Sequence, residues 1–258
     1  MFNLIIILKM VIKPFVTGIT DTGELLVTKG IGSLLVLMGR TPDELTTEKI
    51  SVWVERSGKN VDLAKDLLLK DFLLLTTFAE DAILSNATYK SIALCDLTED
   101  GGFIYLAETE TIKVRLYDLI STVSYGLMGI EEPVASKELL KFERKTISAD
   151  DITRDIDCKG FDLMSLQKHS SITEVQLMFD NGATCKYNPT ELEAQTLAVD
   201  QIQYINQAGS VTSASLDRIV IPLHGIVQVT ISKNSGTRLE CAMRIDEGDY
   251  ELYQMSNR

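Results

Sequence analysis

The chain has 258 residues, of which 45% are hydrophobic and 24% are charged, and its formal net charge is −12. This composition is typical of a folded protein, and the length is enough for one large domain or two domains of about 100–150 residues each. A surface with this charge repels phosphate backbones, so we expect no direct binding of nucleic acid.

The N-terminal segment (MFNLIIILKMVIK) is strongly apolar. Its longest uncharged run covers residues 1–8, far fewer than the ~20 residues needed to span a bilayer. It also lacks the basic region and the small-residue cleavage site of a signal peptide. We expect residues 1–14 to form an apolar arm: a first β-strand, a tail docked on a neighbour, or an arm that meets a membrane surface through Lys9 and Lys13.

Residues 15–146 are expected to form a first β-domain, because short segments of alternating apolar and polar residues predict strands. These predicted strands are 24–28, 31–38, 49–55, 88–94, 103–107 and 111–119. In segment 61–75 (VDLAKDLLLKDFLLL) the apolar residues recur at helical spacing, which predicts a helix after the third strand.

Residues 147–258 are expected to form a second β-domain of the same kind. Its predicted strands are 157–166, 173–180, 184–187, 215–222, 226–232, 237–245 and 250–255. Asn181-Gly182 is a strong signal for a two-residue hairpin turn. Pro189 and the acids after it suit the first turn of a helix, which we expect to run as far as Ile205.

Two pairs of segments share an offset of 125 residues, which predicts a duplicated β-domain. Segment 50–54 (ISVWV) and segment 175–179 (VQLMF) each precede a glycine-containing turn and a helical pattern, and 112–117 matches 237–242 at the same offset. One helix inserted among many short strands, with no βαβ alternation, favours an all-β fold. We therefore expect two tandem eight-stranded jelly-roll sandwiches, each with a short helical insertion.

The four cysteines do not form a C-x-x-C pair; they are Cys95, Cys158, Cys185 and Cys241. Their apolar, alternating surroundings indicate free thiols of a reducing compartment. A disulfide between the halves stays open, because spacing does not fix connectivity.

Asp21-Thr22-Gly23 matches the triplet of aspartic proteases, which need two carboxylates that share one proton. Asp180, in the segment Asp180-Asn181-Gly182-Ala183, is the candidate for the second carboxylate, and it lies 159 residues after Asp21. That separation disagrees with the offset of 125, so the two residues are not expected at equivalent places. We interpret both segments as β-turns.

Other polar motifs also favour structural roles. The glycine-rich segment 29–33 (KGIGS) precedes a predicted strand, whereas a phosphate cradle precedes a helix, so we interpret it as a turn. His169 and His224 lack a zinc-site context, and no G-x-S-x-G elbow supports a Ser-His-Asp triad, although sequence order does not exclude one. Both are interpreted as turn or surface residues.

Acidic residues gather near glycines at 96–100, 150–157 and 246–249, but none of these groups has EF-hand spacing. We interpret them as solvated loops. Trp53 is expected on the face of its strand opposite Val52 and Val54. There it could fill a seam between halves or subunits, or stack on a sugar.

A stretch of the first half resembles a known family. Gly30-Ile31-Gly32 is followed by 33–38 (SLLVLM), by 39–45 (GRTPDEL) and by 49–55 (KISVWVE). This order is similar to the opening of the major capsid proteins of tailless, internal-membrane-containing icosahedral bacteriophages, most nearly the corticovirus type. The resemblance covers residues 20–75 and, more loosely, 150–205, and it contains no catalytic residues.

The resemblance implies a double jelly roll whose trimers form pseudo-hexagonal capsomers of an icosahedral shell over an internal membrane. It implies contacts with other copies, with neighbouring capsid and membrane proteins of the virion, and, through the N-terminal arm, with lipid. The protein would lie in the virion capsid after assembly in the host cytoplasm. No cofactor is required, and structural Ca²⁺ at subunit contacts stays open without assigned ligands.

The sequence therefore favours a structural major capsid protein that is not an enzyme. One alternative is a minor capsid or vertex protein, or a receptor- or glycan-binding β-sandwich. The other is a hydrolase on a β-scaffold, whose best version uses Asp21 and Asp180. Catalytic and cofactor-binding residues are expected to be absent, and metal-binding residues are unknown.

Overall fold

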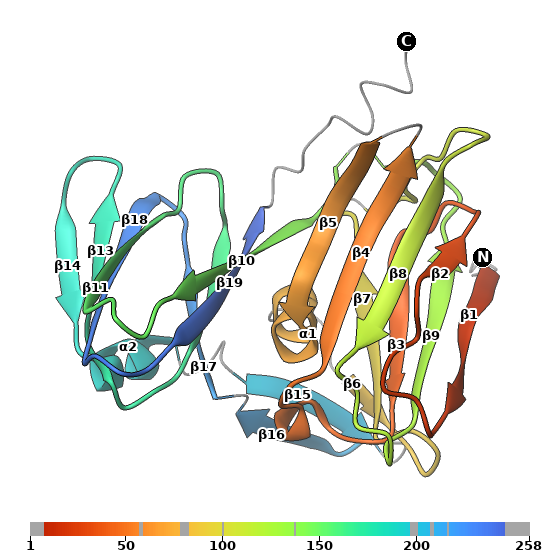
Figure 1. Ribbon diagram of the computed structural model, residues 1–258, viewed down its shortest axis with the longest axis horizontal. Coiled ribbons are helices and arrows are strands. Elements are labelled where there is room, and N and C mark those ends of the chain that lie inside the picture. The colour runs from red at the N-terminus through yellow and green to blue at the C-terminus, as the bar shows by residue number, and fades with distance from the viewer. Residues whose placement is uncertain are drawn as a thin grey trace.

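The computed structural model describes residues 8–56, 59–77, 83–99, 101–136, 138–196, 201–206, 209–215 and 217–245. Within these residues the chain forms two β-sandwiches that lie side by side (Figure 1). Most of the described residues lie in strands, and the two α-helices are short. The expected all-β fold of two jelly rolls is confirmed.

The first half supplies strands β1 to β9 and helix α1. Their bounds are β1 Leu8–Val16, β2 Leu25–Val27, β3 Ser33–Met38, β4 Lys49–Arg56, β5 Lys59–Leu68, α1 Leu69–Thr76, β6 Ile83–Ser85, β7 Ser91–Asp96, β8 Thr111–Tyr117 and β9 Tyr125–Glu131. A 3₁₀ turn, η1 (Pro42–Glu44), precedes β4.

The second half supplies strands β10 to β19 and helix α2. Their bounds are β10 Lys141–Ile147, β11 Thr153–Asp157, β12 Leu163–Gln167, β13 Ile172–Phe179, β14 Thr184–Tyr187, α2 Pro189–Thr196, β15 Gln201–Asn206, β16 Val211–Ser215, β17 Arg218–Pro222, β18 Ile226–Lys233 and β19 Leu239–Ile245.

The two sandwiches have the same connectivity. In the first, the facing sheets are β1-β9-β3-β7 and β2-β8-β4-β5; in the second they are β10-β19-β12-β17 and β11-β18-β13-β14. In each, the first and third strands flank the last strand, the second and fourth flank the penultimate one, and a helix follows the fifth. This is one jelly-roll pattern of eight strands built twice, to which the first sandwich adds β6.

This connectivity corrects one part of the sequence repeat. The segments 50–54 and 175–179 lie in β4 and β13, which occupy equivalent places. Segment 112–117 lies in β8, whose equivalent is β18, whereas 237–242 leads into β19, the last strand of the second sandwich. A period-two pattern matches at many offsets, and loops of unequal length shift the true spacing.

Both predicted helices are shorter than the sequence indicated. Segment 61–75 is divided between β5 and α1. Two register irregularities between β4 and β5 place Val61, Leu63, Ala64 and Leu67 on the buried side, so the inward positions imitate helical spacing. Helix α2 ends at Thr196, and the rest of the predicted helix contains strand β15.

The predicted domain boundaries differ in two places from the strands of the structure. Residues 8–14 of the expected arm belong to β1, which pairs with β9 at the edge of the first sandwich. Strand β10 begins before the expected boundary at 146 and 147 and pairs along its length with β19 of the second sandwich. Residues 1–7 and the predicted strand 250–255 lie outside the described residues.

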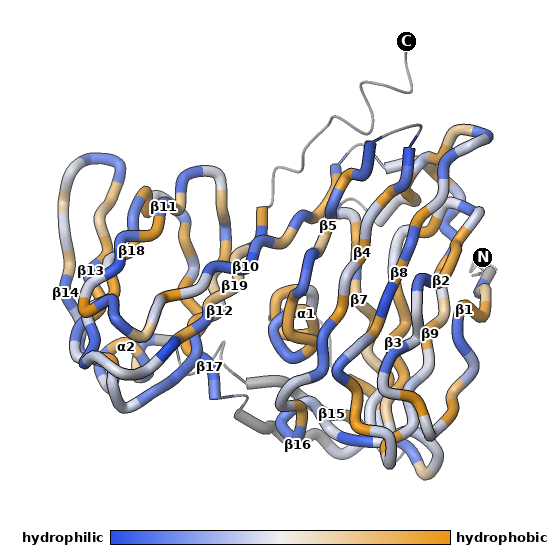
Figure 2. The backbone as a smooth tube through the Cα atoms, in the orientation of Figure 1, coloured by the Kyte–Doolittle hydropathy of each residue, from blue (hydrophilic) through white to orange (hydrophobic). Residues whose placement is uncertain are grey.

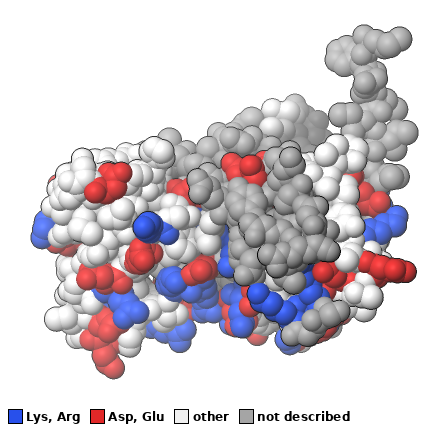
Figure 3. All heavy atoms as spheres, turned by 90° about the horizontal axis from the view of Figure 1, so that it is seen from above, with Lys and Arg blue, Asp and Glu red and all other residues white. Residues whose placement is uncertain are grey.

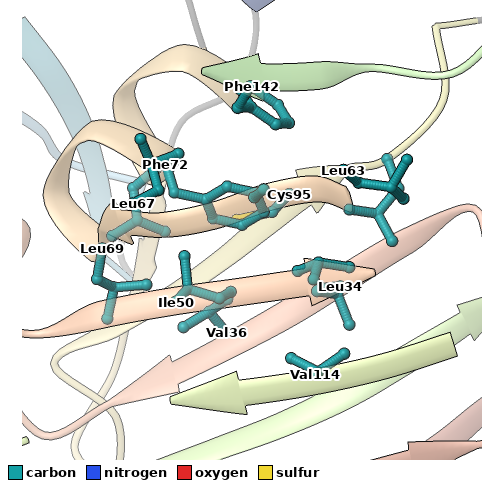
Figure 4. Packing of buried hydrophobic residues seen from close by; sticks show 14 of the residues in the cluster. Leu34, Val36, Ile50, Leu63, Leu67, Leu69, Phe72, Cys95, Val114 and Phe142 are labelled. Atoms are coloured by element: carbon teal, nitrogen blue, oxygen red, sulfur yellow. The ribbon is translucent and has the colours of Figure 1, made fainter. Parts of the chain in front are cut away.

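Each sandwich encloses its own apolar core. Apolar and polar residues alternate along the strands (Figure 2), and charged side chains lie on the surface seen in Figure 3. Figure 4 shows Leu34, Val36 and Ile50 from the first core; all three are fully buried. No helix in the part of the chain that the structure describes is long and apolar enough to cross a membrane.

Candidate functional site: the junction between the two sandwiches

Helix α1 of the first sandwich is tied to the second by a buried ion pair. Arg218 on β17 donates from Nε to Asp71 Oδ1 at 2.6 Å, and its Nη2 lies 3.3 Å from Oδ2. Ser165 on β12 donates to the same Oδ1 at 2.7 Å. All three residues are buried, so these bonds satisfy polar groups that have little access to water.

A second polar contact lies at the other end of the helix. Arg244 on β19 donates from Nη1 to the carbonyl oxygen of Leu75 at 2.8 Å. Its Nε lies 3.0 Å from Asp162 Oδ2, which holds the guanidinium in place. Carbonyls near a helix C-terminus lack partners within the helix, and a cation there is favourable.

Apolar packing is continuous through the junction. The rings of Phe72 on α1 and Phe142 on β10 meet edge to face, with centroids 5.3 Å apart (Figure 4). The core of the first sandwich also includes Leu163, Val220 and Ala242 from the second. These contacts make the junction part of a core rather than a loose contact between domains.

Backbone pairing joins the halves in two further places. Strands β5 and β10 pair in parallel at Ala64 and Phe142, which merges two sheets into one of eight strands. The hairpin β15–β16, inserted before β17, pairs with β6 of the first sandwich through Tyr204 and Ile83 (Figure 1). Two side-by-side sandwiches are therefore held as one rigid unit.

A groove follows the junction on the outer face of the eight-stranded sheet. It consists of two adjoining hollows of about 540 and 930 Å³, which share Arg144 and Arg238. We call it the junction groove. Arg144 crosses its floor, because Nη1 donates to the carbonyl oxygen of Asp66 on β5 at 3.0 Å and Nε donates to Glu240 on β19 at 3.0 Å.

The two aspartates of the protease-like triplets are not brought together. Asp21 lies beside β8 of the first sandwich, where Arg115 Nε donates to its Oδ1 at 3.0 Å. The hydrogen bond from Arg115, with help from the Gly23 amide, lowers the pKa of the Asp21 carboxyl despite the opposing effect of desolvation. Asp180 directly follows β13 in the second sandwich, and its amide donates to the carbonyl of Gly225 at 3.0 Å.

The glycine-rich segment 29–33 is a place of close backbone approach. A Cβ on Gly30 would lie 2.5 Å from the carbonyl oxygen of Ile104, and one on Gly32 would lie 2.4 Å from that of Gly102. Lys29 pairs with Glu131 at 3.2 Å. The glycines therefore allow the chain at 102–104 to pack against the start of β3.

The two histidines are separated by the length of the β12–β17 pair. His169 lies beyond the end of β12 where Gln167 pairs with Arg218, and its Nδ1 accepts from the Ser171 amide at 3.0 Å. His224 is exposed beyond the other end of β17. No group of three or more His, Cys, Asp or Glu residues in the described segments is placed to hold a metal ion.

The cysteines are free thiols, as predicted, and Cys185 is the one that is exposed. Trp53 lies on the outer face of β4 between Asp62 and Lys113, opposite the fully buried Val52 and Val54. The acidic group at 246–249 lies outside the described residues. A role for Trp53 between subunits stays a prediction.

Sequence reasoning missed the residues that hold the junction. Asp71 and Lys70 are the only charged residues within the apolar run 67–75, and a lone carboxylate in such a run indicates a buried partner. The partner Arg218 lies 147 positions later. Nothing local to Arg218 or Arg244 distinguishes either from a surface arginine.

No family model matches the chain, and no curated protein matches its sequence. Solved structures do match its fold. The major capsid protein P2 of bacteriophage PM2 aligns over 92% of this chain and 96% of that chain, with a TM-score of 0.54 and 11% identity. The STIV major capsid protein aligns over 96% of this chain and 98% of that chain, with a TM-score of 0.55 and 11% identity.

A third solved structure, the atomic structure of Sulfolobus Turreted Icosahedral Virus, aligns over 98% of this chain and 93% of that chain, with a TM-score of 0.55 and 10% identity. These alignments extend over both sandwiches and the junction between them. The chain therefore has the double jelly-roll fold seen in the major capsid proteins of these two viruses.

Proposed function

We propose that this chain is a structural capsid protein that assembles with copies of itself into a viral shell. The observation that carries the proposal is the pair of sandwiches of identical connectivity, fixed side by side by the buried Asp71–Arg218 contact. In a rigid unit with two similar halves, each half has a similar outer edge. Three such units around a threefold axis give six similar sectors, which suits a hexagonal lattice.

In its finer form, the proposal is a major capsid protein whose homotrimers tile an icosahedral shell over an internal membrane. The partners would be other copies, and other capsid and membrane proteins of the virion, with the N-terminal arm in contact with lipid. The similarity in fold to capsid proteins of a bacteriophage and of a virus named for Sulfolobus supports a role in a viral shell. The same similarity does not identify the host.

The oligomeric state tests this proposal. Sedimentation of the purified chain is expected to give a species of three times the chain mass of 28.7 kDa. A strict monomer at high concentration would contradict the proposal. Counting copies per purified particle separates a major capsid protein, present in hundreds of copies, from a minor or vertex protein. Binding to a glycan array without any self-association would favour a glycan-binding sandwich instead.

Structural Ca²⁺ at subunit contacts is part of the proposal and has its own test. In the described part of one copy no group of three or more His, Cys, Asp or Glu residues is placed to hold a metal ion. In the proposal, oxygen ligands from two adjoining copies together hold the Ca²⁺. Chelation with EDTA is then expected to loosen contacts between capsomers while each trimer persists. Particles that resist EDTA would exclude a bridging ion.

A further inference from the structure

The junction between the two sandwiches is a head-to-tail contact. The first sandwich contributes its fifth strand and the helix that follows it, β5 and α1. The second sandwich contributes its first strand, β10, and the outer face of the sheet β10-β19-β12-β17. Because the two sandwiches have the same connectivity, each one keeps open the surface that the other one uses at the junction.

The first open surface is the outer face of the sheet β1-β9-β3-β7, which is equivalent to the sheet that α1 covers. Its central row consists of four apolar register partners, one on each strand: Val11, Met128, Leu35 and Leu94. Val11 is 56% exposed and Leu94 is 38% exposed. A continuous row of exposed apolar side chains is typical of a surface that another molecule covers.

The equivalent row of the second sandwich is buried. Ser165 is the third residue of β12, as Leu35 is the third residue of β3. The register partners of Ser165 are Val220 and Ala242, and all three are fully buried. Helix α1 lies over them, because Ser165 donates to Asp71 of that helix. One place in the jelly roll is therefore covered in the second sandwich and open in the first.

The second open surface is formed by β14 and α2, at the far end of the second sandwich (Figure 1). These two elements follow the fourth strand of their sandwich, as β5 and α1 do in the first. In the described sheets no strand pairs with the outer edge of β14 or with that of β1. Helix α2 carries two glutamates and no base, whereas β1 carries two lysines and no acid, so their charges favour contact.

We propose that copies of this chain associate by repeating their own junction, so that β14 and α2 of one copy meet β1 and the outer face of β1-β9-β3-β7 of the next. Strand β14 then extends the sheet of β1 as β5 extends the sheet of β10. Head-to-tail contacts close into a ring when the rotation allows it. In a ring of three copies every contact between sandwiches is of one kind. This interface rests on the proposed function, for which it supplies the surfaces through which copies meet.

The register of the junction predicts which residue of β14 lies at the new contact. Ala64 is the residue of β5 that pairs with β10, and its partner on β4 is Val52. Cys185 of β14 pairs with Leu177, whose place on β13 matches that of Val52 on β4. Cys185 therefore occupies the place of Ala64.

The residue of β1 follows in the same way. Phe142 of β10 lies in the register row that contains Leu163, the first residue of β12. Lys9 of β1 lies in the row that contains Ser33, the first residue of β3. Lys9 therefore occupies the place of Phe142, and it lies beside Cys185 of the neighbouring copy.

Disulfide capture in the full chain tests this contact. Cys185 is the exposed one of the four cysteines. Strands β1 and β14 lie at opposite ends of the molecule (Figure 1), so a bond between residues 9 and 185 joins two copies. Neighbouring strands lie about 4.8 Å apart, which a disulfide can span. In Lys9→Cys, oxidation with copper phenanthroline is expected to give a covalent trimer on a denaturing gel, which reductant removes.

Two controls accompany the capture. Cys185→Ser in the Lys9→Cys background should give no trimer, and neither should Arg154→Cys, which places a thiol on the open edge of β11. Sedimentation of the reduced Lys9→Cys protein separates the interface from the proposed function. Reduced trimers that form no disulfide would overturn the interface and leave the capsid proposal standing. A strict monomer would count against both.

A charge in the apolar row gives a second readout. Leu94→Glu places a carboxylate where the neighbouring copy covers the sheet, so we expect the dissociation constant between copies to rise about tenfold or more. Urea unfolding of the separate chain should change little, because Leu94 is partly exposed. Leu26→Glu is the matched control, since Leu26 is 62% exposed on β2 and lies outside both surfaces. Unchanged association in Leu94→Glu would contradict the interface.

Discussion

Arg218 Nε lies 2.6 Å from Asp71 Oδ1, and this contact joins a strand of the second sandwich to the helix of the first. The exposed fractions of the two residues are 6% and 3%. A charge buried to this degree is costly unless its partner is present. The buried ion pair therefore helps to fix the position of one sandwich relative to the other.

Removal of either partner should destabilise the protein strongly. For Asp71→Leu or Arg218→Met alone, we expect the free energy of unfolding to fall by about 3–5 kcal/mol, because one buried charge is left unpaired. The double variant should recover most of this loss. Urea unfolding of the four proteins measures the coupling. Single variants that lose less than about 1 kcal/mol would show that the pair is solvated.

The glycines of segment 29–33 should not tolerate a methyl group. In Gly30→Ala or Gly32→Ala the new Cβ would lie within 2.5 Å of a backbone carbonyl oxygen. We expect a loss of about 1–3 kcal/mol in unfolding free energy. Gly39→Ala is the matched control, because its nearest neighbour would be the Ser124 amide at 3.2 Å. Equal losses at all three positions would contradict the close approach.

Thiol reagents should distinguish one cysteine from the other three. Cys185 is exposed, whereas burial raises the pKa of Cys95, Cys158 and Cys241 to about 12. The thiolate is the reactive form. At about pH 8 we expect mass spectrometry to find one modified thiol in the folded protein, four after unfolding, and none in folded Cys185→Ser. Rapid modification of a second thiol would show that a core opens.

Glu48 should make the free energy of unfolding depend on pH in the acidic range. Its carboxylate is buried and accepts from the Thr46 amide at 2.8 Å, from Arg40 at 2.6 Å and from Tyr125 at 2.9 Å. Burial alone would raise the pKa of Glu48, but these hydrogen bonds together lower it below the ordinary value of 4.5. A lowered pKa in the folded state stabilises the protein above the unfolded pKa, and this gain is lost as the pH falls through the folded pKa.

The difference in unfolding free energy between the natural protein and Glu48→Gln measures this effect. It should be largest near about pH 6 and should shrink toward about pH 3. A difference that does not change across this range would mean that Glu48 is not ionised in the folded protein.

Much of the strand pattern could be predicted from the sequence. The predicted segments 49–55, 173–180, 184–187 and 226–232 agree closely with β4, β13, β14 and β18. Several other strands were missed, and β9 and β10 show why. Strand β9 contains Gly126 and Gly129, which weaken a strand pattern, and they are there because Phe15 and Ile31 approach too closely for a side chain.

Strand β10 was missed for another reason. It contains five charged or polar residues among seven (KFERKTI), so it resembles a solvated charge run. Only Phe142 and Ile147 in it are buried. Its neighbours β5 and β19 supply the backbone partners that make it a strand, and neither partner is local in sequence.

The sequence by itself determined that this protein is built from two β-sandwiches, because alternation, turn residues and inserted helices are local features of a chain. Only the tertiary structure decided which strands correspond, how the halves are joined, and which surfaces that junction leaves open. Those properties depend on residues such as Asp71 and Arg218, which are 147 positions apart and become partners only when the sheets are in place.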